Sequence, residues 1–95
     1  MAVEGIDEQA RPALARGARL SSDRATGEPV LLFPEGVVHL SSTAQEILSR
    51  CDGQKSVGAI IAALCEEYEA SEPELRVDVL ECLTELGRRK LVVFS

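Results

Sequence analysis

The pattern of apolar and polar positions divides this 95-residue chain into a strand-like half and a helical half. Residues 30–33 are apolar at every position, as expected of a strand covered on both faces in the middle of a sheet. The sequence Pro-Glu-Gly at 34–36 reverses the chain, because proline presets φ for a turn and glycine tolerates positive φ. A return strand follows at 37–40, and a first strand is predicted at 16–20. Together these segments predict an antiparallel meander in chain order.

Beyond the predicted strands, apolar positions recur at helical spacing. Three helices are predicted, and each begins at a serine that accepts hydrogen bonds from free N–H groups: Ser41 or Ser42, Ser56, and Ser71. The first ends near Gly53, since glycine adopts the left-handed conformation of a helix end, and the third runs to about Gly87 or Lys90. The apolar run at 91–94 is predicted as a strand or a docking segment.

These elements predict an α+β fold, in which a three-stranded antiparallel meander is followed by three helices in a winged-helix-like arrangement. Residues 1–12 are predicted to form a flexible N-terminal tail, because they are polar and acidic and end at a proline. Residues 13–95 form one predicted domain. The N-terminus has no apolar run of the kind found in secretory signals or membrane spans, which favours a cytoplasmic location.

The predicted third strand, at 37–40, leaves one edge of the sheet unprotected. It contains no proline and no formally charged side chain, which are the features that usually stop an edge strand from pairing with another chain. The first strand carries Arg16 and Arg19 and follows a proline, so its edge is guarded. The pattern therefore indicates that the third strand pairs with a strand from outside the meander.

The net charge of −6, from 16 acids and 10 bases, argues against nucleic-acid binding and against docking on an anionic membrane. A winged-helix-like order of elements would permit DNA binding. However, the segment from Glu72 to Gly87 contains five acids and one base, and phosphates would repel that surface.

The sequence contains no recognisable catalytic or metal-binding motif. His39 is the only histidine, so any nucleophile activated by histidine would require it. Cys51, Cys65 and Cys82 lack metal-ligand spacing and are interpreted as core residues. The seven glycines are dispersed and form no phosphate-binding loop. We therefore expect a binding protein that is not an enzyme and has no cofactor or metal.

The third predicted helix has more apolar surface than one core contact requires. One stripe at helical spacing consists of Leu75, Val79, Cys82, Leu83 and Leu86. Val77 and Leu80 lie well outside this stripe. They either form a second apolar contact or pack under the sheet or the C-terminal run.

A series of residues extends in order and spacing over about residues 12–93. It consists of Arg19, Leu20, Asp23, Gly27, Val30, Leu31, Leu32, Pro34, Glu35, Gly36, Leu40, Thr43, Ala44, Ile47, Leu48, Cys51, Asp52, Gly53, Val57, Ile60, Leu64, Tyr68, Asp78, Val79, Leu83, Leu86, Leu91 and Val92. In this series the chain resembles PqqD, a family of small proteins of pyrroloquinoline quinone (PQQ) biosynthesis.

The resemblance implies a fold of three strands followed by three helices and a role in recognising ribosomally made, modified peptides (RiPPs). It implies binding of the precursor peptide PqqA and its presentation to PqqE, a radical S-adenosylmethionine (SAM) enzyme that joins a glutamate to a tyrosine within the peptide. In related modules the peptide adds a strand beside the third strand, in a cleft against the third helix. The corresponding positions here are Val37, Val38, His39 and Leu40, together with the helix residues Val77, Leu80, Glu81 and Thr84, which we select from the helical wheel.

Two alternatives stay open at this point. The same edge could pair with a second copy of the chain, which would make the protein a structural homodimer. The run at 91–94 could instead fold back and occupy the edge itself.

Overall fold

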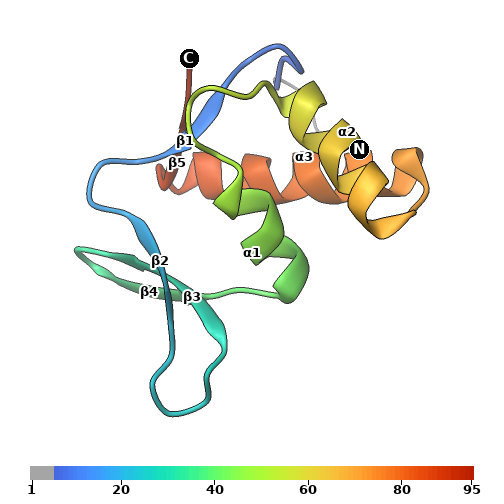
Figure 1. The fold of residues 1–95 in the computed structure, drawn as a ribbon. Helices are drawn as coiled ribbons and strands as arrows, with labels where there is room; N and C mark the ends of the chain where they lie inside the picture. The colour runs from blue at the N-terminus through green and yellow to red at the C-terminus, as the bar shows by residue number, and fades with distance from the viewer. Residues whose placement is uncertain (1–5) are drawn as a thin grey trace.

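The computed structural model describes residues 6–95, in which short strands precede three helices (Figure 1). The elements in chain order are β1 (Pro12–Leu14), β2 (Arg19–Ser22), β3 (Pro29–Phe33), β4 (Gly36–His39), α1 (Ser42–Ser49), α2 (Val57–Tyr68), α3 (Glu72–Arg88) and β5 (Val92–Phe94). The predicted α+β class, a meander followed by three helices, is confirmed. Strand β1 is an addition to the predicted elements, and β5 lies in the apolar run at 91–94.

The meander has the predicted order β2-β3-β4, with antiparallel pairing throughout. In its central register, Leu31 of β3 lies opposite Leu20 of β2 and Val38 of β4. The first strand begins at Arg19, later than predicted, because Gly17 has a φ of 87° and turns the chain just before it. The last strand ends at His39, although the Leu40 N–H still donates to the carbonyl of Pro29 at 3.0 Å.

A second, two-stranded sheet joins the two ends of the described chain. Strand β1 pairs with β5, so that Ala13 lies opposite Val93. Of the two alternatives for this run, a strand and a docking segment, the structure shows the strand. The alternative that this run covers the edge of β4 is wrong, because its backbone groups pair with β1.

The residues before β1 contact the start of α2. The N–H groups of Val57 and Gly58 donate to the carbonyls of Ala10 and Glu8, both at 2.9 Å. Two of the N–H groups left free at a helix start are thus satisfied by this segment. Residues 1–5 of the predicted tail lie outside the described residues, and a domain boundary at residue 13 stays a prediction.

The predicted serine caps form at the first two helices. Ser41 accepts from the Ala44 N–H at 3.0 Å, and Ser56 accepts from the Ala59 N–H at 3.1 Å. Ser71 occupies the cap position of α3 without a side-chain hydrogen bond, and α3 instead has proline and two acids in its first turn. Helix α1 ends at Ser49, before the predicted Gly53.

The hydrophobic core lies between the helices and one face of the meander. Leu31, with 0% of its surface exposed, is the meander residue in a buried cluster whose other members come from the helices and the segments beside them. Those members are Ile47, Leu48, Cys51, Val57, Ile60, Ile61, Leu64, Leu75, Val79, Leu83, Leu86, Leu91 and Val92. Cys65 and Cys82 pack against this cluster half-buried. No helix within residues 6–95 is long and apolar enough to cross a membrane.

Candidate functional site

Strand β4 has one side without a partner strand in the described part of the chain. It pairs with β3 on its other side, in the register that places His39 opposite Val30. The Leu40 N–H points towards β3, since it donates to Pro29. Because backbone groups alternate in direction along an antiparallel strand, those of Val38 also face β3 and those of Val37 and His39 face outwards. We call the outward N–H and C=O groups of Val37 and His39 the free edge.

The side chains of β4 divide between the two faces of the sheet. Val38 and Leu40 are half-buried and pack against the core cluster. Val37 is 47% exposed, and His39 is exposed as well. The residues that present backbone groups at the edge therefore also present their side chains to the surroundings.

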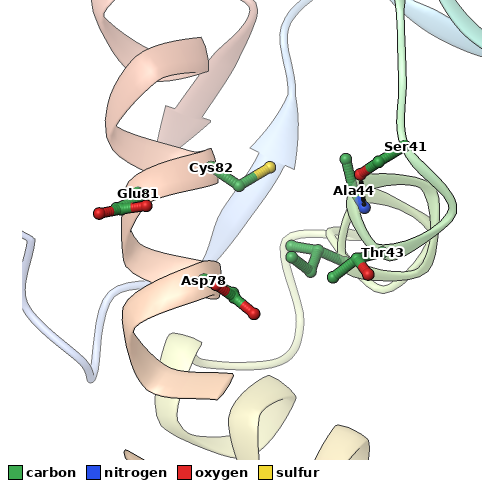
Figure 2. Close-up of a pocket in the computed structure, with 7 residues that line it drawn as sticks. Ser41, Thr43, Ala44, Asp78, Glu81 and Cys82 are labelled. Atoms are coloured by element: carbon green, nitrogen blue, oxygen red, sulfur yellow. Dashed lines mark hydrogen bonds between the residues drawn. The ribbon is translucent and has the colours of Figure 1, made fainter. Parts of the chain in front are cut away.

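A groove lies where β4 passes into α1, between the first turn of α1 and the middle of α3. It has a volume of about 450 Å³ and is lined by Ser41, Thr43, Ala44, Ile47, Asp78, Glu81 and Cys82. Figure 2 shows Asp78 and Cys82 pointing from α3 towards α1, whereas Glu81 points away from it on the outer wall. We call this cavity the α1–α3 groove. Since Ser41 follows β4 within two residues, the groove continues the free edge.

The α3 side of the α1–α3 groove carries two acidic residues, and the lining also includes apolar residues. Neither Asp78 nor Glu81 forms an ion pair with another residue in 6–95. Ala44, Ile47 and Cys82 supply the apolar part of the lining. Such a surface suits a peptide segment that combines an apolar side chain with a basic one.

A second cavity adjoins the groove and extends the same surface towards α2. It has a volume of about 400 Å³, and it shares Thr43 and Asp78 with the groove. Tyr68, which is 51% exposed, lines it together with Leu64 and Leu75. Its helices are held in place by Arg50, which pairs with Glu46 of α1 at 2.9 Å and with Glu67 of α2 at 2.5 Å.

The thiol in the groove is not a nucleophile at neutral pH. Burial raises the pKa of Cys82 to about 11, so that the thiol keeps its proton where a reactive cysteine would be a thiolate. No group of three or more histidine, cysteine, aspartate or glutamate residues within 6–95 could hold a metal ion.

The structure brings Glu81 to the groove, but not the other three helix residues selected from the wheel. Val77 is 50% exposed on the solvent side of α3, and Leu80 packs half-buried against the core. Leu80 lies one turn after Arg76, which forms an ion pair with Glu8, so this flank of α3 faces the N-terminal segment. Thr84 is half-buried, and its hydroxyl oxygen is buried without a hydrogen-bond partner.

The sequence analysis missed two of the helix residues that line the groove. The helical pattern places Cys82 in the core stripe, and it does not select Asp78 as a binding residue. Both lie on the flank of α3 that faces α1, where they line the groove (Figure 2). The helical wheel places them beside the core stripe, but it does not tell which flank faces the edge strand.

Stability should fall at alkaline pH because of the buried thiols. Burial raises the pKa of Cys51 to about 12 and that of Cys82 to about 11, from an ordinary value of 9.0. From pH 9 to 11 the unfolded chain loses thiol protons that the folded chain keeps. The free energy of unfolding then falls by up to about 1.4 kcal/mol per pH unit for each thiol. Below pH 9 the thiols contribute no pH dependence.

Urea titrations at pH 8, 9, 10 and 11 measure this effect. A Cys82→Ala variant is the control, since it removes this one thiol and leaves every other ionisable side chain in place. We expect the variant to lose stability with pH less steeply than the unmodified chain. Equal slopes would contradict the assignment of the pH dependence to Cys82.

The fold and the free edge can be compared with those of known proteins. The family model for coenzyme PQQ synthesis protein D (PqqD) matches residues 28–92, which include β3, β4 and all three helices. The chain belongs to the PqqD family. The resemblance found in the sequence is thereby confirmed, and the family places the chain in PQQ biosynthesis.

Curated relatives within the PqqD family match nearly the whole chain. A protein of Xanthomonas axonopodis pv. citri named PqqA binding protein is 38% identical over 90 residues, which cover 95% of this chain and 98% of the relative. A protein of the same name from Rhodopseudomonas palustris (strain HaA2) is 42% identical over 82 residues, covering 86% of this chain and 80% of the relative.

Solved PqqD structures share the fold. The solution NMR structure of the PqqD truncation of Methylobacterium extorquens PqqCD, a functional and stand-alone RiPP recognition element, has a TM-score of 0.80 at 29% identity and covers 98% of this chain and 99% of its own. The crystal structure of PqqD from Xanthomonas campestris has a TM-score of 0.58 at 39% identity, with coverage of 92% and 97%.

Proposed function

We propose that this member of the PqqD family is a non-catalytic peptide chaperone, which binds PqqA by strand addition and presents it to PqqE. The observation that carries the proposal is the free edge of β4 leading directly into the α1–α3 groove. The relatives named PqqA binding protein and the neighbour that is a RiPP recognition element support this choice of ligand.

The free edge supplies the general affinity for an extended peptide. The backbone of PqqA would pair with the outward groups of Val37 and His39, while Val38 and Leu40 hold β4 on the core. Because backbone pairing is indifferent to sequence, the groove residues Asp78, Glu81 and Cys82 would supply selectivity. Val77, Leu80 and Thr84 do not line the groove, so in this proposal PqqA contacts them only if it extends beyond the groove and around α3.

Presentation acts through effective concentration. When this chain binds both the peptide and the enzyme, the encounter of the peptide with the active site becomes intramolecular. The local concentration of peptide at the active site rises, although this chain makes no contact with the reacting residues. In this proposal the radical chemistry belongs to PqqE, and this chain contributes binding and orientation.

An NMR titration of the isotope-labelled chain with PqqA tests the proposal. We expect the largest amide shifts at Val37 and His39, because these N–H groups gain partners, and smaller shifts at Ser41, Thr43 and Cys82 in the groove. The amide of Val38 should keep its protection from exchange throughout, since it already faces β3. Saturable binding with shifts confined to β1, β5 and the outer face of α2 would contradict strand addition at β4.

A homodimer through the same edge is the second candidate. One observation favours testing it: the side of β4 that has no partner strand within residues 6–95 could pair with β4 of a second copy as well as with a peptide. Sedimentation of the chain with and without saturating PqqA separates the two candidates. A dimer at the free edge dissociates when peptide binds, whereas a peptide-independent dimer uses another surface.

A further inference from the structure

A cavity of about 400 Å³ lies at the end of β4 opposite to the α1–α3 groove. It is enclosed by the β1–β2 loop, the β3–β4 turn and the C-terminal end of α3. Its lining residues are Ala15, Arg16, Ala18, Phe33, Pro34, Glu35, Arg89, Lys90 and Leu91. Three of these residues are basic and one is acidic, and we therefore call it the basic cavity.

The positive charge of the basic cavity is not neutralised within the described chain. Arg16, Arg89 and Lys90 are exposed, and none of them forms an ion pair with another residue in 6–95. The neighbouring Arg88 does pair, with Glu85 at 3.6 Å. On a chain with a net charge of −6, this local excess of bases is a surface suited to an acidic partner.

Local backbone structure holds these bases around the cavity. Gly17, with a φ of 87°, brings the β1–β2 loop so close to the β3–β4 turn that a Cβ on it would lie 3.4 Å from the ring of Pro34. This contact fixes Arg16 beside the turn.

At the end of α3, the N–H of Lys90 donates to Gly87 at 3.0 Å and the N–H of Leu91 donates to Leu86 at 2.8 Å. These are the two bonds of a Schellman motif.

Lys90 has a backbone conformation that glycine adopts at a lower energetic cost. Its φ is 64°, in the left-handed region where a side chain is strained and where most Schellman motifs have glycine. A lysine at this position places a positive charge at the rim of the cavity, although its backbone conformation costs more energy than it would with glycine.

We propose that the basic cavity docks an acidic surface segment of the enzyme that receives the peptide. This inference rests on the proposed function, because it concerns the partner of the presented peptide. Strand β4 begins at Gly36, directly after the turn residues Pro34 and Glu35 that line the cavity. A peptide on the free edge thus has one end at the α1–α3 groove and its other end beside the basic cavity. An enzyme docked there meets the peptide where it leaves β4.

Matched charge reversals test the docking surface on the full chain. Arg89→Glu is compared with Arg24→Glu, which makes the same charge change at an exposed base in the β2–β3 loop, at the far end of the meander. We expect Arg89→Glu to weaken PqqE binding about tenfold or more, because like charges then face each other. Arg24→Glu should bind PqqE as the unmodified chain does, and both variants should bind PqqA normally. Calorimetry at two salt concentrations measures all of these affinities.

Lys90→Gly separates charge from folding. Glycine relieves the left-handed strain, so the melting temperature should stay the same or rise, while PqqE affinity falls and its salt dependence becomes weaker. Equal PqqE affinity for Arg89→Glu and Arg24→Glu would overturn the inference and leave peptide binding by the free edge standing. Loss of PqqA binding in Arg89→Glu would instead assign the cavity to the peptide. Dissociation of a dimer by Arg89→Glu would assign it to a second copy.

Discussion

Replacing His39 with proline should weaken binding of PqqA at least tenfold while the chain stays folded. Proline removes the outward N–H of His39, which the proposed strand addition requires, and its ring stands where the incoming strand would pair. The hairpin tolerates the change because this N–H has no partner in β3, and because the preceding residue is already extended, as proline requires. The affinity is measured by calorimetry, and the fold by circular dichroism.

His39→Ala is the matched control for this experiment. It removes the imidazole and keeps the backbone N–H, so its PqqA affinity should stay within about twofold of that of the unmodified chain, a difference well below 1 kcal/mol. Val38→Pro is a second comparison, since it removes an N–H that faces β3 and should disrupt the hairpin. If folded His39→Pro binds PqqA normally, the peptide does not pair with β4 and the proposed function needs another surface.

Leu31→Ala should be the most destabilising change in the meander. Leu31 is completely buried and connects the meander to the helical core cluster. Truncating a buried leucine costs about 2–5 kcal/mol, because the cavity left behind is only partly refilled. For a domain of this size that corresponds to a fall in melting temperature of roughly 10–25 °C.

Leu32→Ala provides the comparison, because Leu32 is next in sequence but lies on the opposite face and is partly exposed. It should cost about 1 kcal/mol. Urea denaturation of the two variants measures the difference. Equal losses of stability would mean that the two faces of β3 contribute equally to the core, against the burial seen in the structure.

The meander and the helices could be predicted because their signals are local. The turn at Pro34 and Glu35 is indicated by the residue types within it. The side chains of Ser41 and Ser56 accept hydrogen bonds from N–H groups three residues away. Each of these features is determined by a few neighbouring residues. The order of the strands followed from which of them is apolar on both faces.

The pairing of β1 with β5 could not be predicted in the same way. Each strand has three residues, too few for an alternating pattern, and their partners lie at opposite ends of the sequence. The groove presented a similar difficulty. Asp78 and Cys82 are identified as lining residues only by the packing of the helices, which shows which flank of α3 faces α1 (Figure 2). The helical wheel selected Val77 and Leu80 instead. Val77 lies on the solvent side of α3, and Leu80 lies on the flank opposite to the groove.

The pairing of β1 with β5 also has a consequence for the order of folding. Strand β1 meets β5 only after almost the entire chain has been brought together, so this pairing closes a loop that contains nearly all of the described residues. The β3–β4 hairpin, in contrast, closes over a two-residue turn. During synthesis the hairpin and its unpaired edge therefore form while β5 is still missing. The newly made chain therefore exposes this unpaired edge before its fold is closed, at the stage when an open strand edge is most prone to aggregation.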